Sequence, residues 1–271
     1  MQNRRVADDA MIRRAKSFES GAGAYERFRP EYPEALFDDL LASAGPLIGR
    51  GVLEVGAGTG RATLPLARRG VRLEVIEPSQ DMLRVLRDRL TAEHLLDAVT
   101  IRRGTFEDID VAEAPFGVVV AGQSFHWTDP RTRWSKLATL LGEDGIAFLF
   151  WNAWHLDPTH HDLDAVRRVY SEDDSGLVPD IEGANPVHGS SDEEQIAADP
   201  ALTTAVAATY RWDRALPVHD YLSLLSTTSS YAVAGPDDRR RLFTALRPVL
   251  GATVRLRGST LSLSTRAAGR G

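Results

Sequence analysis

A glycine-rich stretch and one acidic residue have the types and spacing that best suit ligand chemistry in this sequence. The stretch covers residues 56–60 (GAGTG) and follows the apolar run Gly51–Val55. Glycine adopts positive φ and has no Cβ to obstruct a ligand pressed against the main chain. Glu77 ends the next apolar run, Val71–Ile76, where a carboxylate can accept hydrogen bonds from two ribose hydroxyls. Together they predict a site for a ligand that contains a ribose.

The spacing of the glycines distinguishes two kinds of ligand. A dinucleotide fingerprint, Gly-x-Gly-x-x-Gly/Ala, would place a small residue at position 61. Position 61 is Arg61, and the third glycine comes one residue earlier, at Gly60. The spacing therefore favours a ligand lying across the loop over a pyrophosphate at the helix N-terminus. Beyond Glu77, Pro78 fixes the turn, and Met82 lies one helical turn on, where it can pack against a purine.

The elements that must position these residues alternate between apolar runs and helical patterns. Further strands are predicted over Val99–Arg103, Gly117–Ala121, Gly145–Trp151, Thr203–Trp212 and Thr253–Ser264. Helices are predicted over Arg61–Arg69, Gln80–Leu90, Arg131–Leu141, Asp162–Tyr170, Val218–Leu225 and Pro236–Leu250. Short apolar strands separated by helices indicate an α/β fold, a doubly wound and mostly parallel sheet covered on both faces.

This pattern also divides the chain into four parts. Residues 1–45 form an N-terminal lid or helical segment, and residues 46–152 form the ligand-binding core. Residues 153–200 are rich in His, Asp, Glu, Gly and Pro and are interpreted as an irregular inserted lid. Residues 201–271 complete the core sheet and add a helical segment on the substrate side.

Four segments resemble the class I S-adenosylmethionine-dependent methyltransferases. They read VLEVGAGTG, IEPSQDML, RRGTFEDI and VVVAGQSFHWTD. The resemblance implies a Rossmann-like sheet of seven strands, in which the first five are parallel and the last enters antiparallel. It also implies S-adenosylmethionine as cofactor, with its ribose on Glu77. The residues implied for the methionine part are Glu54, Gly56, Ala57, Gly58 and Gly60, and those implied for the adenine are Thr105, Phe106 and Glu107.

The chain looks closest to a bacterial branch that includes trans-aconitate-type, small-molecule methyltransferases. The residues that carry this likeness read YERFRPEYP near the start, SFHWTDP after the fourth strand and YRWDRALPVHDYLSLLSTTSS late in the chain. The branch uses many different acceptors. The sequence therefore predicts a small-molecule acceptor, methylated on oxygen, nitrogen or carbon.

Further residues could act on the cofactor or the acceptor. His126 follows the fourth strand directly, and it acts either as a general base or polar contact, or only as a packed scaffold residue. Gln123 is placed for the methionine part of the cofactor. Tyr25 lies where relatives carry an N-terminal lid and could cap the methyl-donor pocket. Trp154 and His155 open the insertion and could line the acceptor pocket.

The amino-acid composition excludes several classes of function. The 271 residues contain no cysteine, which removes disulfides and thiolate ligands, and no histidine spacing predicts a metal site. The net charge of -6 argues against a nucleic-acid partner. No signal peptide or membrane span is expected, which favours a cytoplasmic protein. Two alternatives stay open: an NAD(P)-dependent oxidoreductase, and a nucleic-acid or protein methyltransferase or regulator. The oligomeric state, monomer or homodimer, is also open.

Overall fold

The computed structural model describes residues 22–113, 115–182 and 190–268. These residues belong to two compact units. The sheet unit comprises residues 31–152, 190–210 and 260–268 of the described chain. The helical unit comprises residues 22–30, 153–182 and 211–259.

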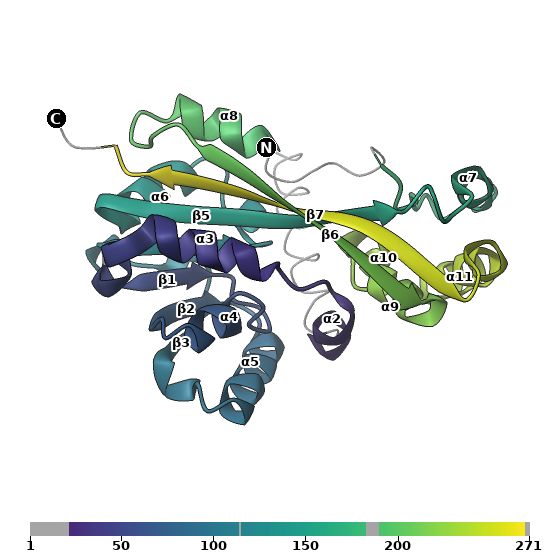
Figure 1. The fold of residues 1–271 in the computed structure, drawn as a ribbon, viewed down its shortest axis with the longest axis horizontal. Coiled ribbons are helices and arrows are strands. Elements are labelled where there is room, and N and C mark those ends of the chain that lie inside the picture. The colour runs from purple at the N-terminus through teal and green to yellow at the C-terminus, as the bar shows by residue number, and fades with distance from the viewer. Residues whose placement is uncertain (1–21, 114, 183–189, 269–271) are drawn as a thin grey trace, which may run out of the picture. The chain divides into compact units, whose positions relative to one another are not determined.

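The described chain forms a seven-stranded sheet with the strand order β3-β2-β1-β4-β5-β7-β6 (Figure 1). The strands are β1 (Val52–Val55), β2 (Leu73–Glu77), β3 (Val99–Arg103), β4 (Phe116–Gly122), β5 (Leu141–Leu156), β6 (Val206–Pro217) and β7 (Thr253–Arg266). Strands β1 to β5 pair in parallel. The strand order reverses between β1 and β4, and open α/β sheets bind ligands beyond the carboxyl ends of the strands at such a point.

Strand β7 runs antiparallel to β5. The backbone nitrogen of Ala267 donates to the carbonyl of Gly145 at 3.2 Å. At the other end of this pairing, the hydroxyl of Thr260 donates to the side chain of Asn152 at 2.5 Å. Residue numbers therefore rise along one strand while they fall along the other. The α/β class, the seven strands and the antiparallel last strand are confirmed.

Helices connect the strands. The α-helices are α2 (Ala22–Phe28), α3 (Glu34–Ala44), α4 (Thr63–Arg68), α5 (Gln80–Ala92), α6 (Arg133–Leu140), α7 (Leu163–Ser171), α8 (Ser190–Ala198), α9 (Val218–Ser226), α10 (Ser229–Val233) and α11 (Pro236–Leu250). Short 3-10 turns are η1 (Gly45–Arg50), η2 (Leu96–Ala98), η3 (Phe106–Asp108), η4 (Val111–Glu113) and η5 (Phe125–Trp127).

The sheet unit buries apolar side chains on both faces of its strands. Along β4, Val118 and Val120 join one core, whereas Val119 and Ala121 join the other. Alternation of this kind follows from the period of two in a strand. The first core includes buried residues of α3, α4 and α5, and the second includes buried residues of α6 and Ile196 of α8. The doubly wound architecture is thus a consequence of the continuous apolar runs in the sequence.

The described residues of the region 153–200 are more regular than the sequence indicated. Strand β5 continues to Leu156, and α8 follows α7 before β6 begins. The segment of α8 reads SSDEEQIAA, in which Ile196 is the one large apolar side chain, so it shows no helical periodicity. Tertiary contacts hold this helix instead: Arg133 and Asp192 form a buried ion pair at 2.6 Å, with side chains 7% and 5% exposed. A lid role for this region stays a prediction.

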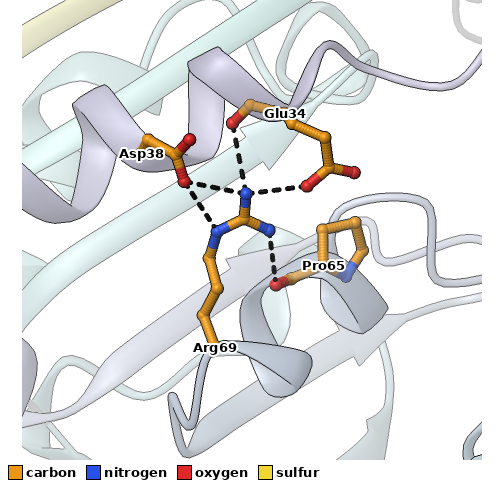
Figure 2. A network of polar contacts seen from close by, with 4 residues as sticks. All are labelled: Glu34, Asp38, Pro65 and Arg69. Carbon is orange, nitrogen blue, oxygen red and sulfur yellow. Dashed lines mark hydrogen bonds and ion pairs between the residues drawn. The ribbon is translucent and has the colours of Figure 1, made fainter.

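Arg69 fastens the N-terminal helix of the sheet unit to the element that follows the glycine loop. Its guanidinium donates to carboxylate oxygens of Glu34 and Asp38 of α3, at 2.7 and 2.8 Å, and to the carbonyl of Pro65 at 3.1 Å (Figure 2). Both carboxylates are largely exposed, so each ion pair contributes modestly. The fork geometry of the guanidinium nevertheless fixes α3 beside α4.

The helical unit has an apolar core of its own. Buried leucines and tyrosines of α7, α9, α10 and α11 form it, together with Val254 and Leu256 of β7. Within the part of the chain that the structure describes, we find no helix whose length and hydropathy would let it cross a membrane.

Candidate functional site

The glycine stretch forms a tight turn between β1 and α4. Gly56, Gly58 and Gly60 have φ of +71°, +56° and +92°, in the left-handed region that glycine enters without strain. The backbone nitrogens of Gly56 and Ala57 donate to the carbonyl of Ile76 at 2.8 and 3.3 Å. The turn is therefore held against the end of β2, where the acidic residue of the sequence pattern stands.

The carboxylate of Glu77 bonds directly to this turn. Its Oε2 accepts a hydrogen bond from the backbone nitrogen of Gly58 at 3.0 Å, and its Oε1 accepts one from Ser79 at 2.9 Å. Burial raises the pKa of Glu77, and the bonds from Ser79 and Gly58 oppose that rise. Each bond occupies one lone pair, and a carboxylate offers about four. Each oxygen therefore keeps capacity for a ligand hydroxyl.

The three glycines differ in what surrounds them. A Cβ on Gly56 would lie 2.4 Å from the Cβ of Ser124, and one on Gly60 would lie 2.5 Å from methyl groups of Leu64 and Leu86. A Cβ on Gly58 would meet no described atom within 4 Å. Protein atoms thus occupy the space beside the outer glycines, whereas the space beside Gly58, next to the Glu77 carboxylate, can accommodate a ligand.

Glu54 lies beneath the turn. It is 1% exposed, and its Oε2 accepts a hydrogen bond from the hydroxyl of Thr63 at 2.7 Å. Burial raises the pKa of Glu54 to about 8, the Thr63 bond lowers it, and the charge of Glu77 raises it further. The Glu54 carboxyl therefore takes up a proton at a much higher pH than an exposed glutamate does. A role for Glu54 toward the cofactor stays a prediction.

The loop after β4 borders the same turn. The hydroxyl of Ser124 donates to the carbonyl of Val55 at 2.5 Å, and its Cβ fills the space beside Gly56. Gln123 has a positive φ of +59°. Its amide donates to the carbonyl of Asn152 at 3.3 Å and accepts from the nitrogen of Asn152 at 3.0 Å. These bonds explain how a non-glycine residue is held in the left-handed region.

Gln123 was predicted to contact the methionine part of the cofactor, and its bonds to Asn152 commit part of its amide to the protein. One N–H and one lone pair of the amide remain for further bonds, so the contact stays a prediction. Ser124 was not singled out from the sequence. Ser124 comes shortly after the fourth strand and packs against Gly56. Only the three-dimensional structure shows that this position supports the glycine turn.

His126 lies in η5 and contacts two indole rings. The Nε1 of Trp151 lies 3.2 Å from Nδ1 of His126, and the His126 ring lies 4.9 Å from the ring of Trp127, tilted by 42°. Trp151 itself is 2% exposed, as expected of a structural residue. The structure therefore gives His126 a defined orientation. Its role as a general base or as a scaffold residue stays a prediction.

The residues proposed for the adenine lie beyond β2 and β3. Met82 is buried in the first turn of α5, where its nitrogen donates to the Ser79 hydroxyl at 3.3 Å, and Pro78 forms the exposed turn before it. Thr105 caps η3 through Asp108.

Phe106 and Glu107 contact the protein itself. Phe106 packs edge-on against Phe125 with ring centroids 5.4 Å apart, and the carboxylate of Glu107 accepts from the backbone of Asp129 at 2.9 Å. Their adenine contacts stay predictions.

Tyr25 lies in helix α2 of the helical unit. The guanidinium of Arg29 lies 5.2 Å from the Tyr25 ring and 5.3 Å from the ring of Trp154. Arg29 also donates to the hydroxyl and carbonyl oxygens of Thr227 at 2.9 and 2.8 Å. Arg29 is half-buried, and these contacts lie within the helical unit. The capping role of Tyr25 stays a prediction.

The helical unit also buries a carboxyl group. Asp180 accepts a hydrogen bond from the indole N–H of Trp154 at 3.0 Å, and the hydroxyl of Tyr221 lies 3.5 Å from the same oxygen. Burial raises the pKa of Asp180 to about 6, although the hydrogen bond from Trp154 and the positive charge of Arg29 both lower it. Sequence reasoning missed Asp180, because an aspartate in a polar segment is ordinarily exposed.

Comparison with known proteins shows that the glycine turn and its surroundings are similar to methyltransferases. Residues 52–145 match the family model of the methyltransferase domain. An uncharacterized methyltransferase of Mycobacterium tuberculosis is 38% identical over 136 residues, which are 50% of this chain and 52% of that protein. A ribosomal RNA small subunit methyltransferase A of Anaeromyxobacter dehalogenans is 35% identical over 105 residues, 36% of this chain and 37% of that protein.

A solved structure extends the likeness in fold. A protein assigned as a type II methyltransferase from Anaeromyxobacter dehalogenans superposes with a TM-score of 0.60 and 22% identity, over 90% of this chain and 100% of that one. At this identity the likeness shows the fold. In sequence, the chain spans about half the length of the first curated relatives that it matches.

Proposed function

We propose that this chain, whose residues 52–145 match the methyltransferase domain, is a class I methyltransferase that transfers the methyl group of S-adenosylmethionine to a small-molecule acceptor. One observation carries the proposal. The Glu77 carboxylate bonds to the backbone of Gly58 at 3.0 Å, and the space where a Gly58 side chain would stand is open. A ribose acceptor and a surface without side chains thus lie side by side, which suits an adenosyl ligand at the carboxyl ends of β1 and β2.

The residues of the sheet unit would then have separate tasks. Glu77 accepts hydrogen bonds from the ribose hydroxyls while it holds the turn through Gly58 and Ser79. The turn supplies close backbone approach for the methionine part. Ser124 keeps the turn in register with the loop after β4. The bound cofactor supplies a methyl group on a sulfonium, which is already electrophilic, and the protein contributes alignment and exclusion of water.

Arg61 supports this ligand over a dinucleotide. Its side chain is 8% exposed and follows Gly60 directly, at the position that a dinucleotide-binding helix keeps small. We infer the small-molecule acceptor from the net charge of -6, which disfavours a phosphate backbone as partner. Within the class, we propose that the chain belongs to the trans-aconitate-type branch, because its SFHWTDP and YRWDRALP segments resemble that branch. The ribosomal RNA methyltransferase among the relatives makes RNA the competing acceptor.

Two measurements test the proposal. First, thermal unfolding is followed with S-adenosylmethionine, S-adenosylhomocysteine, NADH and NADPH, because a ligand of the native state raises its stability. We expect a rise with the adenosyl compounds alone, and a rise with a nicotinamide nucleotide instead would refute the cofactor. Second, transfer of radiolabelled methyl groups is measured to separated metabolite, RNA and protein fractions. Label in the RNA or protein fraction alone would refute the acceptor class.

A further inference from the structure

Strand β6 forms one edge of the sheet. It stands last in the strand order, with β7 on its inner side, and no further strand of the described residues pairs with its outer side. The strand is 12 residues long and reads VAATYRWDRALP. The outer side of an edge strand presents backbone N–H and C=O groups that can pair with another strand. This edge is therefore able to accept a strand from a second molecule.

Alternate side chains of β6 are held by the chain to which they belong. The hydroxyl of Tyr210 donates to a carboxylate of α3 at 2.7 Å, and Arg214 donates to the last carbonyl of α2 at 2.8 Å. The ring of Trp212 covers Gly258, since a Cβ on that glycine would lie 2.3 Å from the ring. Side chains alternate between the two faces of a strand, and the odd-numbered residues from 207 to 215 are all exposed.

The exposed face of β6 carries two opposite charges. Arg211 and Asp213 are both exposed, and within the described residues neither side chain forms an ion pair or a hydrogen bond. Charged side chains on an edge strand ordinarily oppose pairing with other strands. These two charges have opposite sign and stand two residues apart, so they can neutralise each other when β6 pairs with the β6 strand of a second copy.

The order of the charges selects one register for such a pair. Two identical strands related by a two-fold axis run antiparallel, and residues directly opposite each other lie on the same face. When Trp212 stands opposite Trp212 of the second copy, each Arg211 stands opposite an Asp213. The two neighbouring registers that keep the faces in place set Arg211 opposite itself or Asp213 opposite itself. Opposite charges in direct cross-strand pairs are stabilising and like charges are destabilising.

The ends of the strand also match in this register. Thr209 stands opposite Ala215, and Ala208 stands opposite Leu216, so the pairing carries no charge on either side of its centre. Pro217, which has no backbone N–H, comes last in the strand, where a proline does not interrupt the ladder. The whole strand is therefore compatible with pairing to itself.

We propose that two copies of this chain form a symmetric dimer, in which their β6 strands pair antiparallel about Trp212. Backbone hydrogen bonds along the strands supply the affinity, as in other complexes formed by addition of a strand. The two Arg211–Asp213 pairs contribute little each, because they are exposed, but they fix the register and disfavour other strands. Each copy uses this edge once, so the assembly closes at two molecules.

Sedimentation velocity of the full chain over a range of concentrations tests the proposal. We expect a dimer that dissociates on dilution. Arg211→Asp and Asp213→Arg each replace both opposite-charge pairs by like-charge pairs, which should raise the dissociation constant about 10- to 100-fold. Arg72→Asp is the matched control, because it makes the same change of charge at an exposed position before β2 and should leave the dimer unchanged.

A mixture of the two variants gives the sharper test. One variant carries aspartate at both positions 211 and 213, and the other carries arginine at both, so a mixed pair regains both opposite-charge contacts. The equimolar mixture and the double variant Arg211→Asp/Asp213→Arg should therefore dimerise nearly as well as the wild type. A wild-type chain that stays monomeric up to its solubility limit would overturn the proposal. So would single variants that dimerise like the wild type, or a mixture and a double variant that both stay monomeric.

Discussion

Replacement of Glu77 by glutamine should weaken cofactor binding while the protein still folds. The variant keeps one carbonyl oxygen for a backbone N–H, but it places an amide NH₂ where Oε2 accepts from Gly58 or where Oε1 accepts from Ser79. A hydrogen bond to a charged group contributes about 1.5–3 kcal/mol, so we expect a loss of that size in the free energy of unfolding. Loss of charge opposite the ribose should raise the Kd for S-adenosylhomocysteine about 10- to 100-fold.

The assays are isothermal titration calorimetry with S-adenosylhomocysteine and urea unfolding. Glu74→Gln is the matched control, because Glu74 lies on the same strand and pairs with Arg102 at 2.8 Å, with both side chains partly exposed. That change should cost under about 1 kcal/mol and leave the Kd unchanged. An unaltered Kd in Glu77→Gln would refute the assignment of Glu77 to the ribose.

The pH dependence of binding gives a second measure of the same residue. Burial raises the pKa of Glu77, so its carboxylate takes up a proton at a higher pH than an exposed glutamate does. Affinity for S-adenosylhomocysteine should therefore fall as the pH is lowered through that raised pKa. Glu77→Gln has no such proton to gain, and its Kd should lack this dependence.

Three other substitutions test the supports of the site. Ser124→Ala removes the bond to the Val55 carbonyl and should weaken S-adenosylhomocysteine binding about tenfold, whereas Thr128→Ala, which loses a similar bond to Phe125, should lower the melting temperature alone. Glu54→Gln should flatten the pH dependence of unfolding. The pKa of Glu54 rises from 4.5 to about 8 on folding, so wild-type stability falls as the pH rises through that window. Asp192→Ala removes the carboxylate paired with buried Arg133 and should cost about 3–5 kcal/mol in urea unfolding; a loss below about 1 kcal/mol would contradict the ion-pair argument.

The strands and helices with strong periodicity were predictable from the sequence. The strand Val99–Arg103 and the helix Pro236–Leu250 have the predicted bounds. Segments without a pattern were not predictable, because tertiary contacts stabilise them. Helix α8 is held by the Arg133–Asp192 pair, and β5 extends past Trp151 because its last residues pair with β7.

The candidate site also contains features that the sequence predicts and features that depend on tertiary contacts. The glycine turn and Glu77 were predictable, since a strand end followed by glycines has few structural outcomes. The role of Ser124 depends on two segments that are far apart in sequence, and the positive φ of Gln123 depends on the backbone of Asn152. The hydrogen bond that orients His126 likewise comes from an indole on another strand. Such details follow from packing and have no local signature.

The unequal surroundings of the three glycines have an evolutionary consequence. Substitution of Gly56 or Gly60 forces Ser124 or Leu64 and Leu86 aside, so purifying selection for a folded chain alone would preserve both. At Gly58 the space for a side chain is open, so folding restricts this position only through its positive φ. Asparagine and aspartate tolerate that φ. In a descendant that had lost its ligand, drift should therefore reach position 58 first, which makes that codon a marker of retained binding among homologues.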